Sequence, residues 1–169
     1  MDHKTILLAC SILLFLGCLT QSPQPTAGPS PTPATIEIGN VTYVTDGDTI
    51  KVNVSGIIQT VRYIGIDTPE TKYPGRPVEC FGPEADAYNR QLVLGKTVRL
   101  EKDQSNTDRY NRLLRYVYVG TDMVNEALVR EGYATAVSYP PDTRYQDRFQ
   151  QAETLAKAED KGLWKACVN

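Results

Sequence analysis

Five short apolar segments constrain the fold of this chain more than any other feature of its sequence. Each is followed within two residues by Gly, Asp or Ser, which favour turns. Apolar segments of this length with such flanks favour β-strands over helices. The predicted strands are Ile36–Val44 with an irregularity at Gly39–Asn40, Thr49–Val54, Ile58–Ile66, Thr97–Glu101 and Leu113–Val119. Together they predict a mainly β domain.

Three further segments have the features of helices. Pro83 suits the first position of a helix, and Gly95 suits the position after its end. The predicted helices are Pro83–Leu94, Val124–Arg130 and Thr143–Lys161. Strands with interspersed helices predict an α+β (mainly β) fold, namely a five-stranded Greek-key barrel of the OB type with three attached α-helices. Barrels of this type often present a face to oligonucleotides.

Residues 1–18 are predicted to be an export signal rather than part of the fold. The apolar run Ile6–Leu16 is short for a membrane span and has the length of the apolar part of a signal peptide. The sequence Phe15-Leu16-Gly17-Cys18 resembles a bacterial lipoprotein cleavage box, in which Cys18 would carry the lipid. An uncleaved anchor is the alternative. We therefore expect an exported protein, either a cell-surface lipoprotein attached to the membrane or a secreted one.

Residues 19–34 are rich in Pro, Ser, Thr and Gln and show no apolar periodicity. This composition predicts a semi-extended tether, which suits a domain that stands off a membrane. The folded domain is predicted to span residues 35–169, and we expect it to be a monomer.

The composition of this domain excludes several kinds of site. The only His of the chain is His3, so residues 35–169 contain no His base, no His metal ligand and no Ser-His triad. The two Cys of the domain, Cys80 and Cys167, are too few for a structural zinc site, and in an exported chain we expect them to form a disulfide. Closing so long a loop gives such a bond about 4–5 kcal/mol at most. The chemistry must therefore use carboxylates, Lys, Arg, Tyr or a hard cation.

The stretch Val61–Glu70 joins an apolar strand to a turn that carries two carboxylates. Arg62 can bind an oxyanion through two parallel hydrogen bonds. Pro69 fixes a turn after Asp67, and Glu70 emerges beyond it, free to act as a base. An ordinary charged strand end is the alternative interpretation of Arg62 or Glu70 taken alone.

A second acidic turn, Asp46-Gly47-Asp48, precedes another predicted strand. An EF-hand is excluded because its bidentate acid at loop position 12 would fall on Ile57. An ordinary Asp-Gly turn remains the alternative. Under the functional interpretation, Asp48 and Asp67 each supply one carboxylate to Ca²⁺ or another oxygen-seeking cation.

A polar, basic loop runs through Thr107–Tyr116 into the last predicted strand. Its Arg109, Tyr110 and Arg112 place an aromatic ring among guanidinium groups, which is typical of phosphate contact and base stacking. A solvated hairpin is the alternative. The chain has a net charge of −2, so any anion site must be local. The candidates for this local charge are Arg62, Lys72, Arg76, Arg109, Arg112 and Arg115.

Taken together and in order, several motifs resemble the staphylococcal nuclease (thermonuclease) family. They are Asp46-Gly47-Asp48-Thr49, Arg62 with Asp67-Thr68-Pro69-Glu70-Thr71-Lys72, Gly82-Pro83-Glu84-Ala85, Asp108-Arg109-Tyr110-Asn111-Arg112 and Met123-Val124-Asn125-Glu126-Ala127-Leu128-Val129. Each motif is weak alone, but the set is specific and covers nearly all of Val41–Trp164. The resemblance implies an OB-fold barrel with three helices, and Ca²⁺-dependent hydrolysis of DNA and RNA to 3′-phosphate products.

The resemblance also implies a role for each site residue. Asp48 and Asp67, with the backbone carbonyl of Thr68, would bind Ca²⁺. Glu70 would position or deprotonate the attacking water. Arg62 and Arg112 would hold the scissile phosphate. The residues that would contact the rest of the substrate are Lys72, Arg76, Arg109, Tyr110 and Tyr139, the last of them by base stacking.

The chain departs from the family pattern in two ways. Family prototypes are strongly basic, whereas this chain is mildly acidic, which bears on its affinity for long polyanions rather than on the reaction. The prototype also lacks the two Cys of this domain. The expected substrates are single strands or melted duplexes. Two other functions remain open: a binding module that kept the barrel but lost catalysis, and a structural or adhesion protein of the cell surface. The presence of Arg62, Glu70 and Arg112 argues against the first.

Overall fold

A computed structural model describes residues 36–71, 75 and 77–167. The chain divides into two units, Met1–Thr32 and Pro33–Asn169, and every described residue lies in the second. The predictions for the export signal, the tether, Cys18, Lys72 and Arg76 fall outside the described residues. In the part of the chain that is described, no helix is long and apolar enough to cross a membrane.

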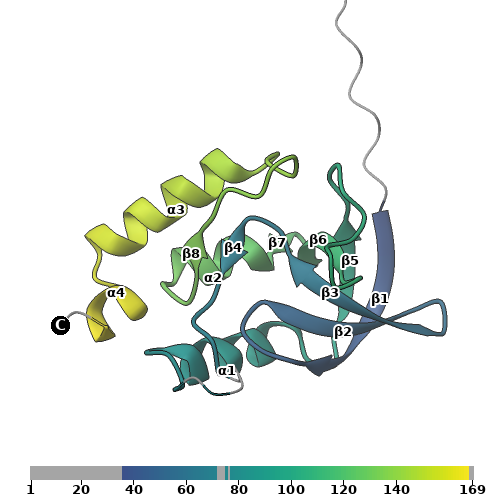
Figure 1. Cartoon of the computed structure of the whole chain (residues 1–169), viewed down its shortest axis with the longest axis horizontal. Helices are drawn as coiled ribbons and strands as arrows, with labels where there is room; N and C mark the ends of the chain where they lie inside the picture. The colour runs from purple at the N-terminus through teal and green to yellow at the C-terminus, as the bar shows by residue number, and fades with distance from the viewer. Residues whose placement is uncertain (1–35, 72–74, 76, 168–169) are drawn as a thin grey trace, which may run out of the picture. The chain divides into compact units, whose positions relative to one another are not determined.

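Five strands form a closed barrel (Figure 1). They are β1 (Ile36–Val44), β2 (Thr49–Val54), β3 (Ile57–Tyr63), β5 (Thr97–Glu101) and β6 (Leu113–Val119). Antiparallel pairing gives the order β3-β2-β1-β5-β6, and a parallel pairing of β3 with β6 closes the ring. The predicted OB-type barrel is therefore confirmed, with strand bounds close to those expected from the sequence.

The predicted third strand is wrong in one respect, because it does not continue to Ile66. β3 ends at Tyr63, and a turn separates it from β4 (Ile66–Asp67). Gly65 makes this bend with a φ of 78°, and a Cβ there would meet ring atoms of Phe149 at 2.7 and 2.8 Å. The bend turns β4 away from the barrel to pair with β8 (Thr135–Ala136). A further short strand, β7 (Asp122–Met123), pairs with β6.

Four helices accompany the barrel, one more than predicted. They are α1 (Gly82–Val93), α2 (Val124–Arg130), α3 (Gln146–Ala158) and α4 (Leu163–Ala166). The helix predicted over Thr143–Lys161 is shorter at both ends. The hydroxyl of Tyr145 donates to Glu101 of β5, which holds the residues before α3 against the barrel. Figure 1 shows α1 on one side of the molecule and α3 on the other.

Two fully buried asparagines connect the helices to the barrel. Asn125 of α2 accepts the N–H of Val117 and donates to the carbonyl of Ile64, each at 2.9 Å. Asn89 of α1 accepts the hydroxyl of Tyr63 and donates to the carbonyl of Asp46, also at 2.9 Å. Each amide thereby satisfies buried backbone or hydroxyl groups. These contacts fix the bend after β3 and the acidic turn before β2.

The predicted disulfide between Cys80 and Cys167 is present in the structure, and it spans 87 residues of sequence. It joins the segment before α1 to the residue that follows α4. The C-terminal segment also contacts the end of α2, where Leu163 donates its N–H to the carbonyl of Gly132 at 2.8 Å. A Cβ on Gly132 would stand only 2.3 Å from the carbonyl oxygen of Lys161. The close approach therefore requires glycine at this position.

We predict that Gly132→Ala destabilises the fold by roughly 2–5 kcal/mol, because the new methyl group meets backbone and φ is 75°. Gly120→Ala is the matched control: its φ is 61°, but a Cβ there has no heavy atom of the described residues within 4 Å. That variant should lose only about 1–2 kcal/mol, from backbone conformation alone. Urea unfolding measures both values. Equal losses would show that the contact with Lys161 carries no cost.

Candidate active site

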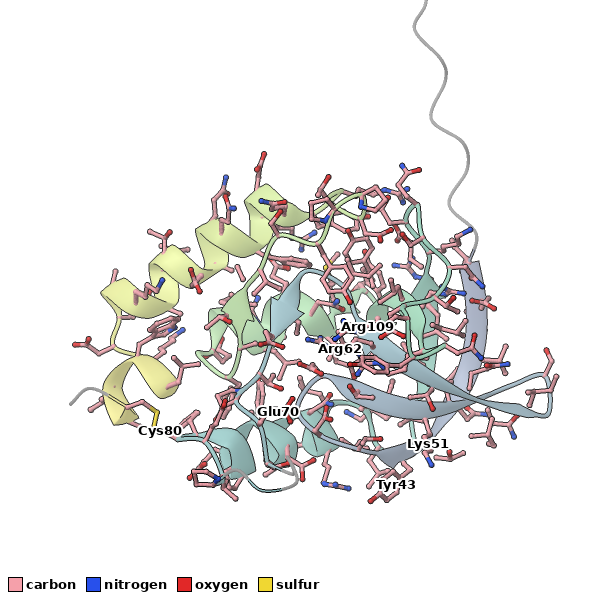
Figure 2. The ribbon with its side chains drawn as sticks, viewed as in Figure 1. Tyr43, Lys51, Arg62, Glu70, Cys80 and Arg109 are labelled. Carbon is pink, nitrogen blue, oxygen red and sulfur yellow. A yellow bond between two sulfur atoms is a disulfide. The ribbon has the colours of Figure 1, made fainter. Side chains whose placement is uncertain are left out.

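The guanidinium group of Arg62 is buried among oxygen atoms at the end of β3, and the residue is only 8% exposed (Figure 2). Its Nη1 donates to the carbonyls of Tyr63 and Ile66, each at 2.9 Å, and lies 3.1 Å from Asp48 Oδ2. Its Nη2 donates to Asp67 Oδ1 at 2.6 Å. One cation therefore bridges the two predicted metal ligands. Among the described residues, no acceptor lies within hydrogen-bonding distance of its Nε.

Asp48 joins the turn before β2 to the turn after β4. Its Oδ2 accepts both the N–H and the hydroxyl of Thr68 at 3.1 Å, and its Oδ1 accepts the hydroxyl of Thr49 at 3.0 Å. Gly47 makes the approach possible, because a Cβ there would stand 2.7 Å from Thr68 Oγ1. The structure thus brings together Asp48, Asp67 and Thr68, as the sequence predicts.

Negative charge is concentrated around these residues. Burial, together with the negative charge of Asp48, raises the pKa of Asp46 to about 6. Burial also raises the pKa of Asp67, against the opposing effect of Arg62. The pKa of Glu70 is raised by burial and then by Asp48 and Asp67. Carboxylates that repel one another in this way favour a bound cation.

The oxygen atoms of the site fit a hard divalent cation. Within the described ranges, no group of three or more His, Cys, Asp or Glu side chains is arranged to hold a metal ion. The sequence analysis predicts the carboxylates of Asp48 and Asp67 and the carbonyl of Thr68 as the donors, with water completing the set, and this ligand set stays a prediction. Oxygen-only coordination with several waters suits Ca²⁺. The side chain of Asp67 is 59% exposed and lines an open cavity of about 220 Å³, so an ion can reach it.

Glu70 lies beyond this turn with an exposed side chain. In the part of the chain that the structure describes, its carboxylate accepts no hydrogen bond, which leaves it available to a water molecule. Its raised pKa gives it a higher proton affinity than an ordinary glutamate. Both properties suit a general base.

Arg112 is positioned by Asp108, a residue that the sequence analysis did not single out. Asp108 Oδ2 accepts Arg112 Nε at 2.6 Å, and Oδ1 accepts the backbone N–H groups of Tyr110 and Arg112 at 2.9 and 3.0 Å. An Asp that bonds to the backbone two residues later is a known turn signal and could have been found in the sequence. Burial opposes ionisation of Asp108, but the bonds from Arg112 and Tyr110 hold its pKa below the usual value.

The basic loop and the buried Arg62 converge at the closure of the barrel. The parallel register pairs Val61 with Leu113 and Arg62 with Leu114. Arg112, the residue directly before β6, is therefore next to the residue that pairs with Val61 of β3. Burial raises the pKa of Asp67, and the positive charge of Arg112 opposes part of that rise, as expected of two groups within electrostatic reach. Tyr110 is 65% exposed, with the guanidinium carbons of Arg109 and Arg112 at 4.8 and 5.4 Å from its ring centroid.

Arg115 and Tyr139, which the sequence analysis names among the residues that would contact the substrate or supply positive charge, are buried or partly buried. Arg115, a candidate for the local positive charge, is 2% exposed and bonds to Glu37 and Asn106, so it stabilises the barrel instead. Tyr139 is partly buried and packs against the core. Its predicted stacking role stays a prediction, as do the catalytic and ligand roles of the other residues.

Residues 60–166 match the family model described as staphylococcal nuclease homologue. A thermonuclease of Staphylococcus hyicus is 41% identical over 160 residues, which is 94% of this chain and 94% of that protein. The chain belongs to the staphylococcal nuclease family. A second family member, a thermonuclease of Staphylococcus intermedius, is 39% identical over 74% of both chains.

Members of the family also occur as parts of longer proteins. The SPbeta prophage-derived endonuclease YokF of Bacillus subtilis (strain 168) is 46% identical over 121 residues. The match covers 70% of this chain but 41% of that protein. The part of YokF that matches this chain is thus less than half of the length of YokF.

We predict that Asp108→Asn lowers the stability of the fold by about 1–2 kcal/mol near neutral pH, because an ionised acceptor of three hydrogen bonds is lost. The folded pKa of Asp108 is depressed, so its contribution is complete above its unfolded value of 3.8 and is lost as pH falls through the lower folded pKa. Urea titrations of wild type and variant from pH 7 to about pH 3 measure the difference. The gap should narrow only below about pH 4. Asp122→Asn, on an exposed residue, is the control. A gap that widens with acid would contradict this assignment.

Proposed function

We propose that this protein is a nuclease that hydrolyses phosphodiester bonds of DNA and RNA, depends on Ca²⁺ and leaves 3′-phosphate ends. The observation that carries the proposal is the contact of one buried arginine, Arg62, with both Asp48 and Asp67. A cation and two hard carboxylate ligands at one point suit a phosphate bound beside a metal ion. Membership of the staphylococcal nuclease family supports the same reaction.

The charge changes of the reaction match the residues present. As water attacks phosphorus, negative charge grows on the equatorial oxygens, and Arg62 and Arg112 offer charge-assisted hydrogen bonds to them. When bound, Ca²⁺ supplies further positive charge beside the phosphate. Glu70 accepts the proton of the attacking water, a role for which residues 35–169 offer no His. The water oxygen bonds to phosphorus while the bond to the 5′ oxygen breaks, and the departing 5′ oxygen takes up a proton from solvent, so the phosphate stays on the 3′ oxygen.

The exposed side chains near the site suit a flexible, single-stranded substrate. Tyr110 presents its ring to solvent between two guanidinium groups, an arrangement in which a base can stack while phosphates are neutralised. We propose that Lys72, Arg76 and Tyr139 extend this contact. The small net charge of the chain implies weak binding of long duplexes.

A binding module without catalysis is the second candidate function. The presence of Glu70 favours the enzyme, because its carboxylate accepts no hydrogen bond from the described residues and has a raised pKa, and a binding module has no use for a base. Digestion of end-labelled single-stranded DNA and RNA with Ca²⁺, and with excess chelator, separates the two. Binding without cleavage in Ca²⁺ would establish the module instead.

We predict that Arg112→Ala and Glu70→Gln each lower kcat roughly 100-fold or more, because each removes a group that acts mainly on the transition state. Arg62→Ala should lose as much, and Asp48→Asn should be partly rescued by extra Ca²⁺. Initial rates at several Ca²⁺ concentrations measure these effects, and circular dichroism shows whether each variant folds. Arg130→Ala, on the exposed end of α2, is the control and should cleave normally. Wild-type rates in Arg112→Ala, or full activity in chelator, would overturn the mechanism.

We also propose that the protein is exported and attached to a membrane through Cys18. The short apolar run, Gly17-Cys18 and the Pro-rich segment that follows support this proposal. One acyl chain binds a membrane only weakly, so stable attachment requires two or more, as lipoproteins carry. Cys18→Ser should release or misprocess the protein, which cell fractionation and mass spectrometry detect. A soluble wild type cleaved after Cys18 would indicate simple secretion.

A further inference from the structure

The backbone of Glu70 is held by a glutamate that the sequence analysis did not single out. The N–H of Glu70 donates to Glu79 Oε2 at 3.0 Å, and the N–H of Glu79 donates to the carbonyl of Glu70 at 2.9 Å. Both polar backbone groups of Glu70 are thus bonded to one partner. The two bonds fix the orientation of the Glu70 backbone.

The backbone of Glu70 also packs closely against Gly82, the first residue of α1. A Cβ on the buried Gly82 would stand 3.0 Å from the carbonyl oxygen of Glu70 and 3.1 Å from that of Pro69. Gly82 donates its N–H to the carbonyl of Glu79 at 3.1 Å. Glu79 therefore stands between Glu70 and the first turn of the helix and bonds to both.

A covalent bond fixes the residue next to Glu79. Cys80 is joined to Cys167, which directly follows α4. In turn, α4 is held to the end of α2 by the hydrogen bond from Leu163 to Gly132. Figure 2 shows the sulfur–sulfur bond at Cys80 below α4, with Glu70 on the adjoining segment. Glu79 is thus attached on one side to Glu70 and on the other to the body of the domain.

The aim of the Glu70 side chain depends on this attachment. The carboxylate is exposed and has no hydrogen-bond donor among the described residues, so within that part of the chain its direction is set by the Glu70 backbone and rotamer. Misplacement of a catalytic group by about 1 Å can cost roughly 100-fold in rate. A residue that fixes the backbone therefore influences the reaction without touching the substrate.

We propose that Glu79 is a positioning residue for the catalytic base: its carboxylate and amide hold Glu70 where Glu70 can reach the attacking water. This inference rests on the proposed function. Glu79→Ala should lower kcat roughly 10-fold or more and leave KM for single-stranded DNA within about twofold, because support of a reacting group typically contributes 10- to 100-fold. Glu79→Gln keeps an oxygen acceptor in place and should retain most of kcat. Equal losses in both variants would show that charge, not position, matters, and would overturn the proposal.

A double-variant cycle tests whether Glu79 acts through Glu70. In the Glu70→Gln background, Glu79→Ala should lower kcat no further, because there is no longer a base to position. Independent, multiplicative losses would contradict the proposal. Glu84→Ala, on an exposed glutamate of α1, is the matched control and should keep wild-type kcat. All rates are measured well below the thermal midpoint of each variant, so that loss of fold does not enter.

The outcomes also separate this inference from the proposed function. If wild type does not cleave nucleic acid, or if Glu70→Gln cleaves normally, the proposed function fails. If Glu70→Gln is impaired and Glu79→Ala is not, the inference alone fails. Replacement of both Cys80 and Cys167 by Ser should lower kcat in the same manner as Glu79→Ala but to a smaller degree, since the two hydrogen bonds remain. Full activity of that variant would remove the disulfide from the proposal.

Discussion

The burial of Arg62 is the constraint on which the site and much of the fold depend. A guanidinium group that is almost out of contact with water is stable only if oxygen atoms surround it. Here these oxygens come from the end of β3, from β4 and from the turn before β2. The chain must therefore bend after β3, and the acidic turn Asp46-Gly47-Asp48 must lie next to the guanidinium group of Arg62. Loss of any one of these partners leaves a buried charge without compensation.

This dependence explains why a site of so many like charges persists. Burial raises the pKa of Asp46, Asp67 and Glu70, and the negative charge of Asp48 adds to the rise in each of them. Arg62 offsets part of the repulsion between Asp48 and Asp67, and a bound cation would offset more. Under the proposed function, the atoms that stabilise the fold also bind phosphate and metal, at some cost to stability.

Much of the fold and of the site follows from local sequence. Strand lengths, the Pro and Gly residues at the ends of α1, and the presence of two Cys in residues 35–169 were enough to predict the barrel, the helix and the disulfide. The bend at Gly65 was missed because its cause, the ring of Phe149, comes from a distant helix. Arg115 was misjudged because its partner Glu37 lies 78 residues away. Glu79 and Arg62 likewise owe their roles to contacts across turns, and such contacts have no periodic signature in the chain.

The closure of the barrel by β3 and β6 has a consequence for the folding of the protein during its synthesis. Arg62 meets the neighbours of Arg112 only through the parallel pairing of these two strands. On the ribosome, a nascent chain that stops short of Val119 contains Arg62, Asp48, Asp67 and Glu70, but it lacks the complete strand that closes the ring around them. Non-local pairings of this kind also form late and slowly. The candidate site is therefore complete only once β6 has been synthesised.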